Sequence, residues 1–310
     1  MFLDKIKSKE SGILLYGITP PKAQVEPLKV VEIAEKTLVR LHSLDIDALV
    51  VYDVQDESAR TSEERPFPFI SAHDPFEFAK EHLHSLDIPK IIYRPAGKFT
   101  QEELTLWLDD VIAHGFSPVF VGIPAPDFKP ITSLSEAYSI WRKYQDTSVI
   151  GAVTIPERHA VLNDEDQRIL DKMSSGVSYF VSQCVFNVDY AKRVIDDLVK
   201  TCVHKEIALP TIIFTLTACG SLKTLHFMEW LGIHVPEALK EEFKTSENVL
   251  ARSVEVCMTI AEELIHYCAE KGVPFGFNIE SVAIRKDEIE ASIAMVNRIG
   301  ETLKAQGLRK

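Results

Sequence analysis

The sequence lacks the segments that direct a chain into a membrane or out of the cell. No apolar run approaches the roughly 18 residues of a membrane-spanning helix, and residues 1–7 hold no long apolar core of the signal-peptide type. Cysteine is sparse and no Cys-x-x-Cys pair occurs; the five are Cys184, Cys202, Cys219, Cys257 and Cys268. We therefore expect a cytoplasmic protein with reduced thiols and no thiolate zinc site.

An excess of positive charge is also missing. The chain has 34 Lys and Arg against 46 Asp and Glu, a formal net charge of -12. Because an acidic surface repels phosphate backbones, nucleic acid is not an expected partner. A metal site needs three or four convergent ligands, and the two closest histidines, His82 and His84, would point apart on a helix. We predict no metal site.

What the sequence does contain is a repeating alternation of apolar strand-like runs and helical patterns. Eight runs read as strands, at residues 11–18, 45–52, 89–95, 117–123, 148–155, 178–187 (a strand that ends at Gln183 and then opens a helix), 206–215 and 272–279. Between these runs, apolar residues recur at the spacing of a helix. The pattern indicates two or three helices in 220–270, before the last strand, and a final helix at 286–305. The pattern predicts one (β/α)8 TIM-barrel domain over residues 1–310. An open doubly wound sheet is the alternative, weakened because no Gly-x-Gly-x-x-Gly follows a strand.

In such a barrel, the residues that follow each strand share the face where ligands bind. The polar ones are Thr19, Asp53, Gln55, Arg94, Asp127, Glu157, His159, Gln183, Thr215, Thr217, Asn278 and Glu280. The pair His159 and Glu157 indicates either acid/base or ligand chemistry, or a solvated loop pair. Lys172 is either a solvated residue near a helix end or a contact for an anionic ligand.

The order of the motifs resembles that of the methylenetetrahydrofolate reductase family, flavin-dependent (β/α)8 barrels that reduce methylenetetrahydrofolate to methyltetrahydrofolate. Four segments carry the resemblance: 16–22 (Tyr-Gly-Ile-Thr-Pro-Pro-Lys), 155–159 (Ile-Pro-Glu-Arg-His), 172–176 (Lys-Met-Ser-Ser-Gly) and 181–186 (Val-Ser-Gln-Cys-Val-Phe). The resemblance implies FAD contacts by Ile155, Glu157, His159 and Lys172, and NAD(P)H as the hydride donor. It implies folate contacts by Gln183 and by Phe227, which from the sequence alone reads as core or pocket wall.

The chain also departs from the family at several positions. Gly17 stands where the family has its catalytic Glu, and residues 122–125 (Gly-Ile-Pro-Ala) replace the flavin-holding Leu-Arg-Gly-Asp turn. Asp53 stands where the family has a small residue. The segment of the last strand that begins at Asn278 also differs from the family's motif. A pterin commonly pairs with a carboxylate, which Asp53 or Glu280 can supply.

Two hypotheses follow from these departures. The first is a divergent flavin-dependent reductase of folate one-carbon units, with Glu280 as the acid, Gln183 beside it, and Phe227, Asp53 and Asn278 as further substrate contacts. The second is a flavin-free folate- or pterin-binding barrel that acts with a partner or in one-carbon transfer. Either would take a folate or pterin as its ligand, and either could form a homo-oligomer or bind a partner subunit. A barrel enzyme unrelated to folate is a third reading.

Overall fold

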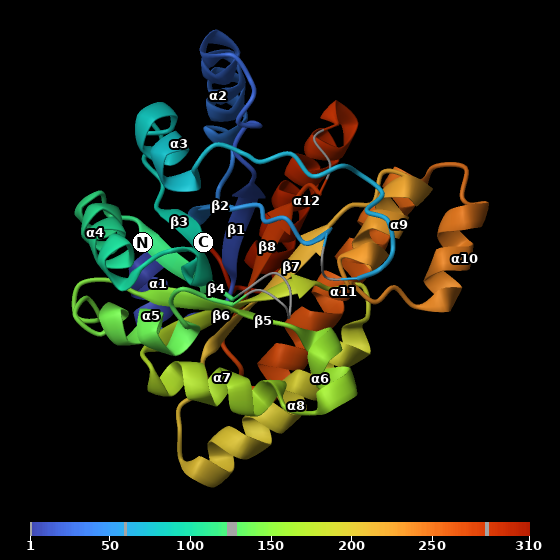
Figure 1. The fold of residues 1–310 in the computed structure, drawn as a ribbon. Helices are drawn as coiled ribbons and strands as arrows, with labels where there is room; N and C mark the ends of the chain where they lie inside the picture. Colours follow the sequence, from blue (N-terminus) through green and yellow to red (C-terminus); the bar gives the residue numbers. More distant parts are fainter. Residues whose placement is uncertain (1, 59–60, 123–128, 283–284) are drawn as a thin grey trace.

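Eight parallel strands close into a barrel in sequence order, from β1 to β8 and back to β1 (Figure 1). The computed structural model describes residues 2–58, 61–122, 129–282 and 285–310. The strands are β1 (Ile13–Ile18), β2 (Ala48–Val51), β3 (Lys90–Pro95), β4 (Ser117–Val121), β5 (Ile150–Thr154), β6 (Val177–Cys184), β7 (Thr211–Thr217) and β8 (Phe275–Glu280). The predicted (β/α)8 barrel is confirmed, and closure between β1 and β8 excludes the open sheet.

The helices surround the sheet and connect its strands (Figure 1). They are α1 (Phe2–Ser8), α2 (Pro27–Leu41), α3 (Pro75–His82), α4 (Gln101–Ala113), α5 (Leu134–Trp141), α6 (Pro156–Leu162), α7 (Glu165–Ser174), α8 (Val188–Lys205), α9 (Leu222–Trp230), α10 (Glu237–Thr245), α11 (Val249–Lys271) and α12 (Lys286–Ala305). A short 3₁₀ turn, η2 (Ala96–Lys98), follows β3. The extra helices predicted before the last strand are α9 to α11. In the described part of the chain, no helix is both long and apolar enough to cross a membrane.

Capping side chains fix where several helices begin. Thr100 and Glu103 form a capping box at the start of α4, each side chain bonding the other residue's backbone N–H. Ser133 and Glu136 do the same for α5. Such reciprocal bonds satisfy donors that the first helical turn leaves without a partner.

Two predicted boundaries are wrong. Residues 206–210 do not belong to β7, because Glu206 ends α8 in a left-handed conformation and Pro210 has no N–H for a sheet ladder. The strand predicted at 148–155 ends one residue earlier, at Thr154, and is followed by α6 and α7, which are separated by Asn163 in a left-handed conformation. Pro156 is pre-organised for the first helical position, so α6 begins there.

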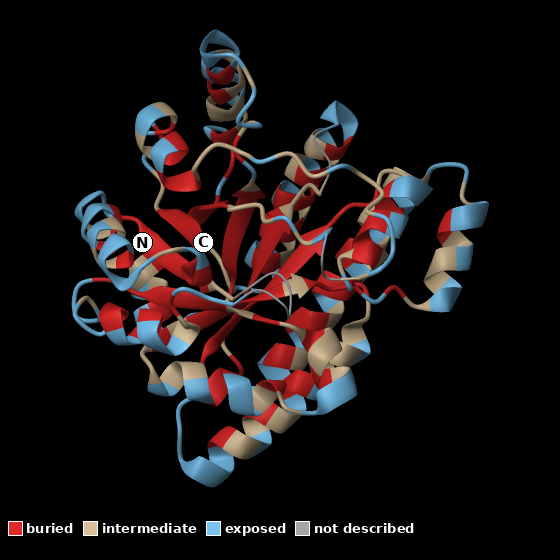
Figure 2. Cartoon of the chain, in the orientation of Figure 1, coloured by how far each residue is buried: buried red, intermediate tan, exposed pale blue. Residues whose placement is uncertain are grey.

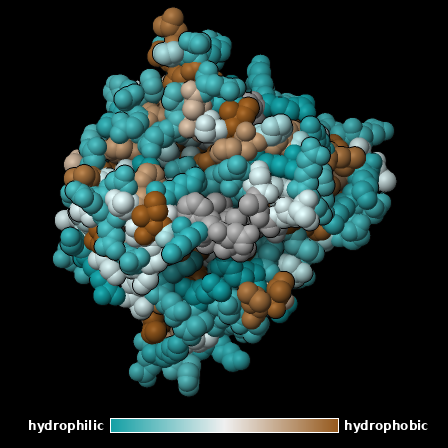
Figure 3. Space-filling view, viewed as in Figure 1, coloured by the Kyte–Doolittle hydropathy of each residue, from teal (hydrophilic) through white to brown (hydrophobic). Residues whose placement is uncertain are grey.

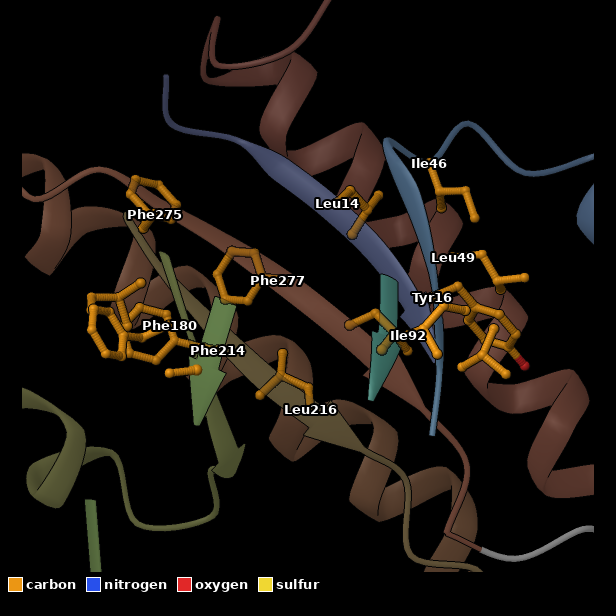
Figure 4. Close-up of a cluster of buried hydrophobic side chains, with 14 of the residues drawn as sticks. Leu14, Tyr16, Ile46, Leu49, Ile92, Phe180, Phe214, Leu216, Phe275 and Phe277 are labelled. Atoms are coloured by element: carbon orange, nitrogen blue, oxygen red, sulfur yellow. The ribbon is translucent and has the colours of Figure 1, made fainter. Parts of the chain in front are cut away.

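The core has two layers, because successive residues of a strand point to opposite sides of the sheet. Inside the barrel, α1 supplies Phe2, whose ring packs edge-on against Tyr179 of β6 at 5.4 Å. Between sheet and helices lies the larger layer, part of which Figure 4 shows around Leu14, Phe214 and Phe277. Figure 2 shows the strands buried almost throughout. All five cysteines are buried with free thiols.

Candidate functional site

The carboxyl ends of β1, β2, β7 and β8 bring five inward-facing residues together. Gly17 of β1 is in register with Glu280 of β8, and Thr215 of β7 is in register with Asn278. Tyr52 follows β2 and packs against the inner core. Because all five lie on the barrel side of their strands, they form a polar ring at its mouth.

Glu280 carries the only carboxyl group among these five residues. The thiol of Cys184 donates to Glu280 Oε1 at 3.3 Å. Asn278 Nδ2 donates to the Tyr52 hydroxyl at 2.7 Å and to Thr215 Oγ1 at 3.3 Å. Burial raises the pKa of Glu280, and hydrogen bonds from Tyr52, Cys184 and Asn278 oppose that rise.

Gly17 is glycine for a steric reason. A Cβ at this position would lie 2.7 Å from Tyr52 Cε2 and 3.2 Å from Glu280 Cβ. The missing side chain therefore makes room for the Tyr52 ring and for the carboxyl that enters from the neighbouring strand.

An irregularity in β6 turns Gln183 and Cys184 toward different neighbours. The register of β6 against β7 shifts between Val181 and Cys184, so an extra residue is accommodated there. Cys184 reaches Glu280, while Gln183 Nε2 donates to the Leu231 carbonyl beyond α9 at 2.9 Å. Gln183 Oε1 is buried and has no hydrogen-bond partner within the described ranges, as is true of Asn278 Oδ1 and Thr217 Oγ1. Buried polar atoms normally have partners, so these three can serve a ligand.

Asp53 lies apart from the ring. Its side chain accepts from Gln55 Nε2 at 2.5 Å. Burial, opposed by the nearby Arg94, raises the pKa of Asp53 to about 6. Arg94 is itself buried between the Phe99 and Trp107 rings and pairs with Asp74 at 2.8 Å. Of the other predicted strand-end residues, Thr19 is exposed and Asp127 falls outside the described residues.

The residues predicted to hold a flavin form a network within the protein instead. Glu165 of α7 is fully buried; it accepts from Arg158 Nη1 at 2.9 Å and from the Ile155 N–H at 3.0 Å. The imidazole of His159 is also fully buried, with Nδ1 accepting from the Glu165 N–H and Nε2 3.1 Å from Asp197 Oδ2 on α8. Glu157 accepts from the His234 N–H at 3.4 Å.

Lys172 joins this network from α7. Its Nζ donates to the Val153 carbonyl of β5 at 2.7 Å, and burial lowers the pKa of the amine to about 8. His159 and Gln183, both placed by the sequence on the ligand-binding face, contact different elements of the structure. The register shift in β6 sends Gln183 to α9, and the helical turn of α6 carries His159 against α8.

Phe227 packs against the long segment that follows β2. Its ring stacks with Trp230 at 6.0 Å, meets the edge of Phe67 at 5.3 Å, and lies 5.1 Å from the Arg65 guanidinium. Tyr52, Cys184 and Arg65 are the site residues that sequence reasoning missed. Tyr52 could have been found from strand alternation, since Ala48 and Val50 also face inward, whereas the other two depend on a bulge and on a long loop.

Comparison with known proteins gives a family and one near relative. The methylenetetrahydrofolate reductase family model matches residues 127–296. An uncharacterized protein from Clostridium thermocellum that binds two copies of 5-methyl-5,6,7,8-tetrahydrofolic acid is 42% identical, with a TM-score of 0.84 over 96% of this chain and 98% of that one. EDTA monooxygenase from Chelativorans sp. BNC1 is 9% identical with a TM-score of 0.55 over 97% and 95%, a likeness of fold alone. No curated protein matches.

Proposed function

The chain belongs to the methylenetetrahydrofolate reductase family, and from this premise we propose that it binds a reduced folate of the 5-methyltetrahydrofolate type without a flavin. The ligand's pterin head lies at the mouth of the barrel, against Glu280 and Asn278. Gln183 contacts it from the end of β6.

One observation carries this proposal: a carboxyl group enters the barrel mouth beside Gly17, where the neighbouring strand supplies no side chain. A carboxylate pairs with the exocyclic amine and ring N–H of a pterin through two parallel hydrogen bonds. Gln183 Oε1 and Asn278 Oδ1, which have no partner among the described residues, offer further hydrogen-bond acceptors next to this carboxylate. Support also comes from the Clostridium thermocellum relative, which is similar over nearly the whole chain.

The absence of flavin from the proposal is supported by the network around Glu165. His159 is fully buried with both ring nitrogens engaged, and one of the three donors of Lys172 is taken by a strand carbonyl. An imidazole held in this way does not fit a FAD contact. Of the segment 122–125 that replaces the family's flavin turn, only Gly122 lies within the described residues. A flavin-free barrel would act with a partner or in one-carbon transfer.

Reduction of methylenetetrahydrofolate is the second candidate, because Gly17 and Glu280 are paired across β1 and β8. The family's acid would then have moved to the adjacent strand. Since burial raises the pKa of Glu280, this carboxyl would hold a proton to give to the substrate nitrogen.

A titration tests both candidates. Purified protein is titrated with 5-methyltetrahydrofolate by calorimetry, alone and after incubation with FAD and desalting, and its absorption spectrum is recorded. We expect folate binding with no flavin absorbance, and the same titration gives the number of sites. Stoichiometric FAD with NAD(P)H-dependent reduction would establish the second candidate, and absence of folate binding would reject both.

A further inference from the structure

Residues 61–74, which follow β2 and are called the strap below, hold a cation over the aromatic residues of α9. Figure 1 shows the chain after β2 running across to α9 and returning to α3. At its far end, Trp230 Nε1 donates to the Glu63 carbonyl at 3.0 Å. At its near end, the Ala23 N–H donates to the Ser71 carbonyl at 2.8 Å. The strap is thus fixed on both sides of Arg65.

Arg65 lies on a platform made by two nearly parallel rings. Its guanidinium is 5.1 Å from the Phe227 ring and 5.4 Å from the Trp230 ring, whose planes differ by 16°. Phe69 covers it at 5.5 Å. Arg65 Nε is buried without a hydrogen-bond partner in the part of the chain that the structure describes. Cation–π contacts hold the guanidinium in place but leave the Nε–H donor unused.

A second cation stands beside the first. Lys223, in the first turn of α9, lies 4.6 Å from the Phe67 ring of the strap. Neither Arg65 nor Lys223 forms an ion pair with another described residue, although the carboxylates of Asp56 and Glu57 lie near enough to act on the charge of Arg65. In a chain of net charge -12, two such neighbouring cations make a local site for an anion.

This cationic site adjoins the polar ring through α9. Gln183 of β6 bonds the carbonyl of Leu231, the residue after Trp230. The end of β6 is thereby tied to the end of α9, the helix that carries the platform rings. A reduced folate has a flat aromatic middle and a tail with two carboxylates, which match the rings and the cations.

We propose that Arg65, with Lys223 beside it, receives the carboxylates of the ligand's glutamate tail, so that the site selects folates over pterins that lack the tail. This inference rests on the proposed function. Arg65 is the stronger determinant, because its planar fork can pair with a carboxylate through two hydrogen bonds.

The test compares two ligands on matched variants. Dissociation constants for 5-methyltetrahydrofolate and for 6-methyltetrahydropterin, which has no tail, are measured by calorimetry on wild type, Arg65→Gln, Lys223→Gln and Arg252→Gln. Arg252 pairs with Glu242 away from the strap and controls for loss of one positive charge. We expect Arg65→Gln to weaken folate binding about 10- to 100-fold and to leave pterin binding within about twofold. Lys223→Gln should weaken folate binding less, and Arg252→Gln should change neither.

Three results would overturn the inference while the proposed function stands: Arg65→Gln weakening both ligands equally, tightening folate binding, or changing nothing. Equal weakening of both ligands would mean that Arg65 only holds the strap in its conformation. Tighter folate binding would mean that the Arg65 side chain occupies the position that the ligand takes. Arg65→Lys keeps the charge, and we expect it to restore part of the tail preference, which a merely structural role would not do. Failure of wild type to bind 5-methyltetrahydrofolate would instead reject the proposed function.

Discussion

At the ends of β7 and β8 the barrel leaves buried polar atoms with unused hydrogen-bond capacity, whereas beside β5 its buried charged groups are paired with one another. Glu280 has a thiol and hydroxyl neighbours but no cation, and Asn278 Oδ1 lacks a partner among the described residues. Glu165 has both a guanidinium and a backbone N–H. Both carboxyl groups are buried, but Glu165 of α7 is paired with a cation, whereas Glu280 at the barrel mouth forms no ion pair with another described residue.

The difference separates stability from binding. A buried ion pair loses much stability when one partner is removed, because the other charge is left without compensation. A buried carboxyl without a cation destabilises the fold on its own account and is retained where it meets a ligand. The two sides of the barrel should therefore respond to mutation in opposite ways.

Glu165→Ala should produce the largest effect. It leaves Arg158 and the Ile155 N–H without their partner, and we expect a loss of about 3–5 kcal/mol in the free energy of unfolding. Urea denaturation measures this loss, and folate affinity of the remaining folded protein should be unchanged. Glu241→Ala, an exposed partner of Lys244, is the control and should cost less than about 1 kcal/mol. Equal losses in the two variants would mean that the network beside β5 is not structural.

Glu280→Gln should change binding and stability in opposite directions. Losing the charged acceptor should cost about 2–3 kcal/mol of affinity for 5-methyltetrahydrofolate. The ligand-free protein should melt at a higher temperature, because burial raises the pKa of Glu280 and the charged form opposes folding. That gain should be small in acid and grow as pH rises toward the raised pKa. Calorimetry and thermal scans at several pH values measure both.

The matched control for this variant is Glu288→Gln. Glu288 on α12 is also a buried carboxyl; burial raises its pKa, and the Arg285 guanidinium, 3.8 Å away, opposes that rise. It should gain stability without losing folate affinity. If Glu280→Gln loses both stability and affinity, the carboxyl is structural and the contrast between the two sides disappears.

Gly17→Ala should have a smaller effect on the free energy of unfolding, confined to the polar ring at the barrel mouth. Its Cβ would lie 2.7 Å from the Tyr52 ring, so we expect about 1–2 kcal/mol of destabilisation from overpacking. Gly300→Ala provides the same chemical change in α12, where the added Cβ is 3.6 Å from Leu14, and should stabilise by about 0.5–1 kcal/mol. Opposite signs in urea denaturation would support the steric reading, and two stabilised variants would contradict it.

Asp53→Asn should have the smallest effect on stability, and that effect should depend on pH. The pKa of Asp53 is raised to about 6, above its usual value of 3.8, so the folded state holds its proton longer than the unfolded state. Wild type therefore loses stability as pH rises from about 4 to about 6, and the loss is constant above that range. Asp53→Asn should gain stability at pH 7.5, where the wild-type carboxyl is charged, and almost nothing near pH 4. A gain that does not depend on pH would show that the carboxyl does not titrate in this way.

Much of the fold followed from patterns that act locally. Apolar runs at regular intervals specified eight strands, and the Thr100–Glu103 box fixed the start of α4. Boundaries failed where a single residue decided them, as at Glu206 and Pro210. The motif at 155–159 suggested a loop with side chains free for a cofactor, but Pro156 begins a helix that buries His159.

The sequence by itself determined the order of β/α units, the family resemblance and the loss of the acid at Gly17, because these depend on residues close together in the chain. Only the tertiary structure decided that Glu280 fills the space beside Gly17, since closure of the barrel pairs the first strand with the last. It also decided that Arg65 lies on the Phe227 ring. Those contacts depend on which strands become neighbours and on a bulge in β6, and hydrophobic periodicity carries no information about either.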